Sequence, residues 1–317
     1  MRTRAAGVAG SLAATLAGVV VVSCGGGGAV SRSTTPDPGA GRPSVRAAPT
    51  TPAATPSSIR DLGSVTVIRR HGVRVLGSPQ QAATLRQVAT LAEAAIPRVT
   101  AVWGPAWARR ATIVVPADRH DAALLTGVAH LGHFAAITTS ELDAAAPRRP
   151  PHSNRVTINP SAWSRLRRVG REVVITHELT HVASSESTGR DTPKWLAEGL
   201  ADYVGFLGRG LPPTAVAREL ARRIRTGNIP ARLPPNRAFR PASARLAVAY
   251  EQAWLACVAI ADQFGQGRLV RFYRAVGRSR DRSDRQAVDH ALHTVLGLDR
   301  DRFVARWRAL MRAELAG

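Results

Sequence analysis

The chain has 317 residues, a formal net charge of +22 and only two cysteines. Nearly all of its 44 basic residues are arginines, a bias that a GC-rich genome explains without any ligand, although a basic surface also attracts anionic lipids or envelope polymers. Because zinc-finger spacing, an aromatic RNA-binding signature and an isolated basic tail are all missing, we expect no specific nucleic-acid partner.

The N-terminus has the features of an export signal. Arg2 and Arg4 precede an apolar stretch over residues 5–22, and small residues surround Cys24. A cysteine at this break, after a small residue and two apolar ones, resembles the lipobox of bacterial lipoproteins. The resemblance implies that residues 1–23 are a removed signal peptide and that Cys24 carries a lipid. The alternatives are an uncleaved membrane anchor, for which the apolar stretch just suffices, and plain secretion; all three place the rest of the chain outside the cytoplasm.

A tether is expected next, over residues 24–60. This segment consists mostly of Gly, Ser, Thr, Pro and Ala, which bury too little apolar surface to offset the entropy of ordering. A coil of that length has an r.m.s. reach of about 30–35 Å. We therefore expect a disordered connection that holds the remaining domain, residues 61–317, away from the membrane.

The pattern after residue 63 predicts a small sheet followed by helices. β-branched runs on either side of His71-Gly72 predict a hairpin. Helical spacing over 80–102 is interrupted by Pro97. Further strands are predicted at 111–115, 134–138 and 155–159. From residue 161 the chain is nearly all helix, with breaks at 208–213, 229–241 and 265–267. We expect an α+β fold, with a sheet lobe over about 61–160 and a helical lobe over about 161–317.

The segment His177-Glu178-Leu179-Thr180-His181 lies at the junction of the two lobes, in a stretch without a helix breaker. On a helix, His177 and His181 are one turn apart and share a face. Two imidazoles at this spacing can bind one Zn²⁺, and Glu178 beside them can take a proton from water on the metal. The alternative is two surface histidines on a solvated helix.

A third ligand is expected on a second helix. Thr192 is a candidate N-cap and Pro193 fits the first helical position, so Glu198 falls in the second turn. Gly199 removes a side chain where this helix must approach the first one. Asp202, one turn beyond Glu198, can accept the outer N–H of a ligating histidine.

These two segments resemble the gluzincin metallopeptidases, specifically the peptidase MA-like domains found in bacterial lipoproteins. The similarity extends to the strand and proline at 156–160 and to the residues at 249–254 and 263–265. It implies a zincin-like fold with the active-site helix as the floor of a cleft between the lobes. It also implies one Zn²⁺ per chain, held by His177, His181 and Glu198, with Glu178 as general base. A sheet edge that pairs with extended substrate is implied as well, and 134–138 is our candidate for it.

The remaining candidates are less specific. Tyr250, on a later helix, can stabilise the oxyanion of the tetrahedral intermediate, but a packed core tyrosine fits its sequence context equally well. The pairs His290/His293 and His130/His133 are better explained by solvated surfaces, and Cys257, in an apolar run, by a buried structural thiol.

Together these features predict a zinc-dependent peptidase on the outer face of a bacterial membrane. Its Glu178 would activate a water on zinc for attack on the scissile carbonyl of a peptide or protein substrate. Because the G-x-M-E-N signature of aminopeptidases is missing from the sequence, an endopeptidase is favoured. The alternatives are a zinc-holding envelope scaffold that does not hydrolyse peptides and a binder of anionic polymers. We take a monomer as the default.

Overall fold

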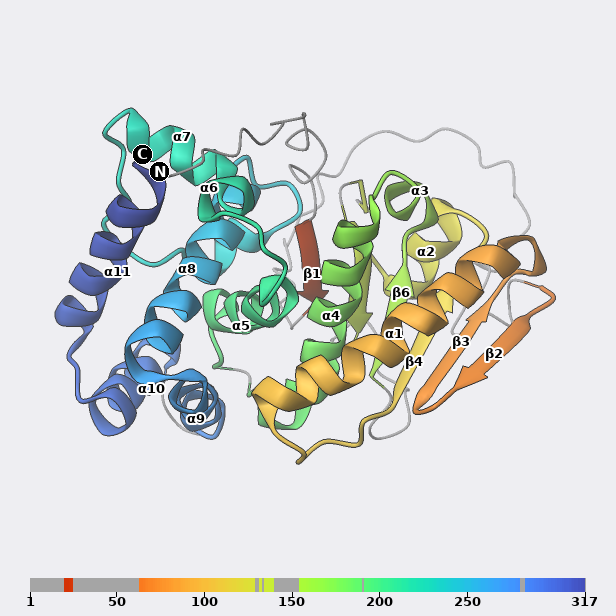
Figure 1. Cartoon of the computed structure of the whole chain (residues 1–317), viewed down its shortest axis with the longest axis horizontal. Coiled ribbons are helices and arrows are strands. Elements are labelled where there is room, and N and C mark those ends of the chain that lie inside the picture. Colours follow the sequence, from red (N-terminus) through yellow and green to blue (C-terminus); the bar gives the residue numbers. More distant parts are fainter. Residues whose placement is uncertain are drawn as a thin grey trace, which may run out of the picture.

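The structure is a computed structural model that describes residues 20–24, 63–128, 131–132, 134–139, 154–189, 191–279 and 283–316. Nearly all of the predicted tether lies outside these residues, and of the predicted signal peptide only its last few residues lie within them. A sheet lobe and a helical lobe stand side by side (Figure 1). The predicted α+β class, with a small sheet lobe followed by a helical lobe, is therefore confirmed.

The sheet lobe contains a mixed sheet. Its strands in the described part of the chain are β1 (Val20–Cys24), β2 (Thr66–Arg70), β3 (Val73–Gly77), β4 (Ala111–Val115), β5 (Phe134–Thr139) and β6 (Arg155–Ile158). They lie in the order β1-β5-β6-β4-β3-β2. The pairs β2–β3 and β5–β6 are antiparallel, and the other neighbours are parallel. The predicted hairpin and the three further predicted strands are confirmed, whereas β1 had no counterpart in the sequence analysis.

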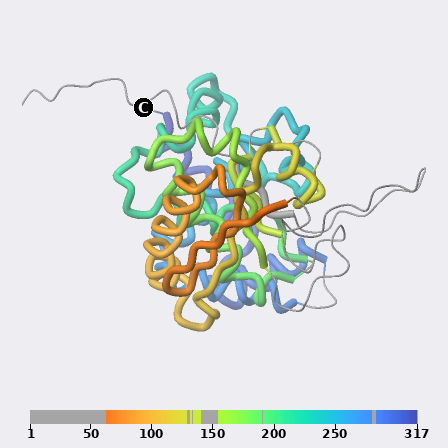
Figure 2. The backbone as a smooth tube through the Cα atoms, turned by 90° about the vertical axis from the view of Figure 1, so that its right-hand side faces the viewer, coloured from red at the N-terminus to blue at the C-terminus, as the bar shows by residue number. Residues whose placement is uncertain are grey.

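Both faces of the sheet bury apolar side chains, because successive residues of a strand point to opposite faces. In β4, Ile113 and Val115 belong to the main core, whereas Val114 packs on the other face with Leu125 of α2 (Arg119–Thr126). The main-core face is covered by α1 (Ala82–Trp103) and α4 (Arg168–Ser184), as Figures 1 and 2 show.

The interruption predicted at Pro97 is wrong, because α1 continues through it to Trp103. A proline inside a helix removes one backbone hydrogen bond and usually costs about 3 kcal/mol. Here the helix buries a continuous face against the sheet and α4, and residues on both sides of the proline contribute to it: Leu85, Val88, Ala92, Ala95 and Val99. Burial of that face offsets the cost.

The helical lobe begins after β6. Its α-helices are α3 (Pro160–Trp163), α4, α5 (Lys194–Phe206), α6 (Pro213–Val216), α7 (Arg218–Arg225), α8 (Leu246–Phe264), α9 (Gln266–Gly277), α10 (Asp284–Ala291) and α11 (Arg300–Leu315). Helix α4 contacts α1 and β5 on one side and α5 on the other. One buried cluster extends from Val73 to Leu315, so both lobes share a core. Within the described residues, no helix has the length and apolar character needed to cross a membrane.

Two glycines of α5 allow close helix packing. A Cβ at Gly199 would overlap the carbonyl oxygen of Ala253 in α8 and lie 2.9 Å from the Cys257 sulfur. Gly199 therefore faces α8, not α4 as predicted from its place beside Glu198. The residue of α5 that lies closest to α4 in this way is Gly205, about one and a half turns later. A Cβ added at Gly205 would lie 3.2 Å from the carbonyl oxygen of Val173.

A buried carboxylate joins α8 to α7. Glu251 accepts hydrogen bonds from the backbone N–H groups of Glu219 (3.1 Å) and Leu220 (2.6 Å), at the N-terminus of α7. Burial raises the pKa of Glu251 to about 7, although these two N–H groups and Arg222 act to lower it. The folded chain therefore binds a proton at Glu251 more tightly than the unfolded chain does.

We predict that Gly199→Ala lowers the free energy of unfolding by about 2 kcal/mol, since the added methyl group meets backbone that has no room to move. Gly267→Ala in α9 is the matched control, because a Cβ there meets nothing within 4 Å, and it should leave stability unchanged or slightly higher. Denaturant unfolding of both variants measures the difference. Equal stabilities would show that α5 and α8 pack less closely than described.

We predict that Glu251→Gln, which has one acceptor oxygen for two backbone N–H groups, becomes more stable relative to the parent as the pH rises from 4 to 8. An acid whose pKa rises on folding costs no stability below its unfolded value of 4.5. Its cost grows as the pH rises and is complete above about pH 7, on the order of 1–3 kcal/mol. Thermal unfolding of parent and variant across this range tests it, with the exposed Glu314→Gln as control. A constant difference at all pH values would contradict it.

Candidate metal centre

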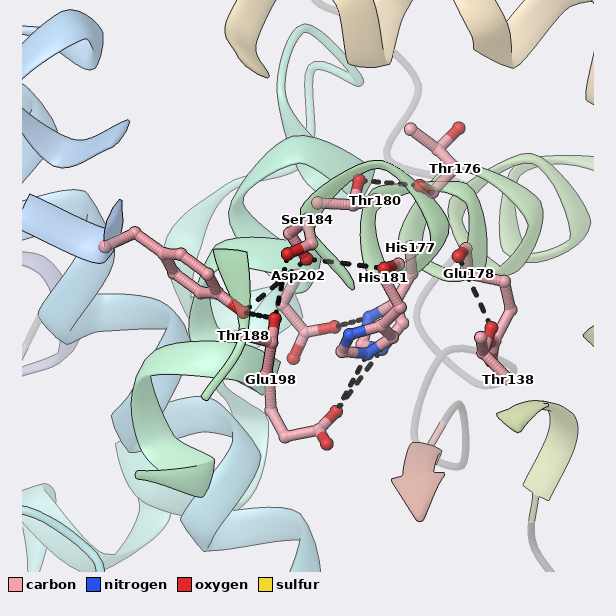
Figure 3. Close-up of polar contacts among 11 residues, drawn as sticks. Thr138, Thr176, His177, Glu178, Thr180, His181, Ser184, Thr188, Glu198 and Asp202 are labelled. Atoms are coloured by element: carbon pink, nitrogen blue, oxygen red, sulfur yellow. Dashed lines mark hydrogen bonds and ion pairs between the residues drawn. The ribbon is translucent and has the colours of Figure 1, made fainter. Parts of the chain in front are cut away.

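Helix α4 places two imidazoles at one point. His177 and His181 lie one turn apart on the face directed toward α5, and their Nε2 atoms are 3.0 Å apart (Figure 3). The two side chains are buried, His181 being 6% exposed. The predicted surface alternative, two histidines on a solvated helix, is therefore excluded by their burial.

Helix α5 carries Glu198, the third predicted ligand, although the helix begins differently from the prediction. Its N-cap is Pro193, and the first backbone N–H, that of Lys194, is bound by the side-chain oxygen of Asn236 at 2.9 Å. Thr192 is not the cap; its hydroxyl accepts from the N–H of Gly189 in the preceding loop. Glu198 follows in the second turn, with one carboxylate oxygen 3.4 Å from the Nε2 atoms of both His177 and His181.

Asp202, one turn further along α5, lies on the opposite side of His177. Its carboxylate oxygen is 2.7 Å from Nδ1 of that histidine. An Nδ1–H that donates to a carboxylate leaves the Nε2 lone pair directed toward Glu198 and His181. The predicted role of Asp202, which is to fix the tautomer of a ligand, has the geometry it requires.

Glu178 projects to the sheet side of α4. One of its carboxylate oxygens accepts a hydrogen bond from the hydroxyl of Thr138 on β5 (Figure 3). The other, Oε1, is buried and has no hydrogen-bond partner among the described residues. Thr138 was within the strand predicted as the substrate edge, but no signal in the sequence showed that its hydroxyl would reach Glu178.

The three donor atoms fit one zinc ion. Tetrahedral Zn²⁺ with ligands at about 2.0–2.2 Å separates neighbouring donor atoms by about 3.3 Å. The distances here are 3.0, 3.4 and 3.4 Å, and among the described residues His177, His181 and Glu198 are the group of three that could hold a metal. Two imidazoles and one carboxylate form the donor set of a catalytic zinc site with an open fourth position.

The electrostatics of this group favour a cation. Burial acts to lower the pKa of His177, but Asp202 and Glu198 outweigh it and raise that pKa to about 10. Burial acts to raise the pKa of Glu198, but the two histidines outweigh it and hold that pKa well below its usual range. Burial lowers the pKa of His181. The buried carboxylates thus favour a positive charge at the three donor atoms, and zinc binding would displace any proton held there.

The loop between α4 and α5, the helices that carry the candidate ligands, is held by α9. The hydroxyl of Tyr273 lies 2.7 Å from that of Thr188 and 3.5 Å from that of Ser184 at the end of α4. Gly277 lies against the loop so closely that a Cβ there would overlap the carbonyl oxygen of Ser187. This role of Tyr273 was not predicted from the sequence, because only the fold brings residue 273 to the loop.

The other candidates have different outcomes. Tyr250 is buried in α8, and its ring packs edge-on against Phe239 at 5.3 Å, so its catalytic role stays a prediction. His290 and His293 belong to no described group that could hold a metal, and His130 and His133 lie outside the described residues. Cys257 is a buried free thiol, as predicted.

Comparison with known proteins identifies no close relative. No family model matches the chain, and no curated protein does. Among solved structures, an M1 zinc metallopeptidase from Deinococcus radiodurans, a mutant bound to a Tyr-Ser-Ala substrate, has a TM-score of 0.39 at 16% identity, over 80% of this chain and 52% of that one. A two-domain M1 zinc metallopeptidase bound to L-arginine has a TM-score of 0.37 at 16% identity, over 77% and 48%. The chain thus spans about half the length of these structures.

We predict that the protein binds one zinc ion per chain and that His181→Ala abolishes tight binding. Asp202→Ala should weaken zinc affinity about 10–100-fold by releasing the orientation of His177, whereas Asp202→Asn, which retains an acceptor oxygen, should weaken it less. Competition with a chelator of known affinity measures these values. A full equivalent of tightly bound zinc in His181→Ala would place the metal elsewhere.

Proposed function

We propose that this chain is a zinc-dependent peptidase held on the outer face of a bacterial membrane by a lipid on Cys24. The single observation that carries the catalytic part is the buried group of His177, His181 and Glu198, whose donor atoms lie 3.0–3.4 Å apart with Glu178 beside them. A site that only stored zinc would have no use for the carboxylate of Glu178.

Zinc bound there would act as a Lewis acid toward a carbonyl oxygen and would lower the pKa of a nearby water. Glu178 is the base that takes the proton of the attacking water and returns it to the leaving amine. Its partnerless oxygen, Oε1, is the atom that remains for this transfer, since Thr138 donates to the other.

Burial gives Glu178 a higher proton affinity than an exposed carboxylate has. Burial raises the pKa of its carboxyl to about 8, while His177 and the Thr138 hydroxyl act to lower it. A group that both accepts and gives back a proton works best when its pKa is close to the working pH. Thr138 also keeps the carboxylate turned toward the sheet edge, where a peptide strand would lie.

Three finer parts of the proposal rest on the sequence. The lipobox resemblance around Cys24 supports the extracytoplasmic anchor, and the missing G-x-M-E-N signature supports an endopeptidase. Tyr250 is our candidate donor to the oxyanion, which Tyr250→Phe would test through a lower kcat at unchanged zinc content.

We predict that Glu178→Gln abolishes peptide hydrolysis, lowering the rate at least about 100-fold, while one zinc ion stays bound. The test uses mature chain 24–317 with Cys24→Ser to keep it free of lipid. It is incubated with a diverse peptide library, and new termini are identified by mass spectrometry. Cuts inside peptides, made by the parent alone, would support an endopeptidase.

Other outcomes would favour other functions. Equal cleavage by parent and Glu178→Gln would refute the assignment of the base. Bound zinc without cleavage in either protein would favour an envelope scaffold. Salt-sensitive adhesion to anionic polymer that survives both Glu178→Gln and removal of zinc would favour the polymer binder.

A further inference from the structure

The position of β1 has a bearing on how the site is reached. Residues Val20–Cys24 pair in parallel with β5, Val22 lying opposite Ile137, Ser23 opposite Thr138 and Cys24 opposite Thr139. Thr138 is the residue that donates to Glu178. The N-terminal strand therefore occupies the sheet edge nearest the base.

The helices complete this surface. Besides pairing with β5, β1 packs against α4, α5 and α8. Figure 1 shows it between the two lobes, and Figure 3 shows its pale red arrow beside the metal ligands. With β1 in place, His177, Glu178 and Glu198 are all 0% exposed. A peptide needs access to these side chains, so this arrangement of the chain is closed to substrate.

The sequence of β1 suits two environments. Val-Val-Val-Ser-Cys is rich in β-branched residues, which favour strands. The same residues end the apolar stretch of the predicted signal peptide, where they would lie in the membrane. Because one segment cannot occupy both places, its departure toward the membrane would vacate the β5 edge.

We propose that the outer edge of β5, with α4, α5 and α8, is a strand-binding surface whose first occupant is this chain's own segment Val20–Cys24. The unprocessed chain is closed to peptides until that segment leaves. Hydrolysis of the Ser23–Cys24 bond, which consumes one water, would remove Val20, Val22 and Ser23, three of the four residues that pair with β5. A lipid on Cys24 would then hold the remaining paired residue at the membrane. The consequence for catalysis rests on the proposed peptidase function; the strand pairing does not.

The test uses the full chain, 1–317, carrying Cys24→Ser so that it stays unprocessed, and two variants of it. Val21→Pro with Val22→Pro removes two adjacent backbone donors, so whichever of them faces β5 is lost. Ala47→Pro with Ala48→Pro, in the predicted tether, is the matched control. Hydrogen exchange of residues 134–139 reports pairing, and hydrolysis of peptides cut by mature 24–317 reports access.

We expect the β5 amides that do not bond to β6 to be protected in the parent and the control and to exchange at least tenfold faster in the Val21/Val22 variant. Peptide hydrolysis should rise at least tenfold in that variant. Equal exchange in all three proteins would overturn the proposal. So would hydrolysis by the parent as fast as by mature 24–317. Faster exchange with no hydrolysis by any protein, mature 24–317 included, would support the strand pairing and refute the peptidase function instead.

Discussion

The structure depends on the contact between α4 and α5, because the charged groups of the site are buried where these helices meet. Two histidines on one helix face two carboxylates on the other across this contact. Removing one partner from such a group leaves an uncompensated buried charge, which is strongly destabilising. The helices must therefore keep a fixed separation and rotation. Gly205 allows α5 to approach α4, and Gly199 allows α8 to pack on its far side.

The residues of the site could be predicted from sequence because their spacing is local. A four-residue repeat places His177 and His181 on one face in any helix, and the same rule relates Glu198 to Asp202. The strands of the sheet lobe were predictable for a similar reason, since β-branched runs bounded by turn residues favour strands. Each of these features is contained within a dozen residues.

The features that were missed depend on contacts between distant segments. The side chain of Asn236 binds the first backbone N–H of α5, and Tyr273 binds the loop before that helix. Neither contact can be inferred from residues near Thr192. Continuation of α1 through Pro97 depends on the surface that covers the helix. Likewise, an apolar N-terminal stretch predicts burial. Whether it is buried in a membrane or in a sheet depends on contacts with other parts of the chain or with lipid.

The contact between Gly277 and the loop at 185–192 gives that loop an unusual character. Surface connections ordinarily tolerate changes of length. This one is attached at both ends to helices that carry the candidate ligands, and it packs closely against α9 between them. It behaves as a spacer of defined length. Insertions and deletions that accumulate as the sequence diverges should therefore avoid it and collect in segments such as 207–212, which connect helices without bearing on the spacing of the ligands.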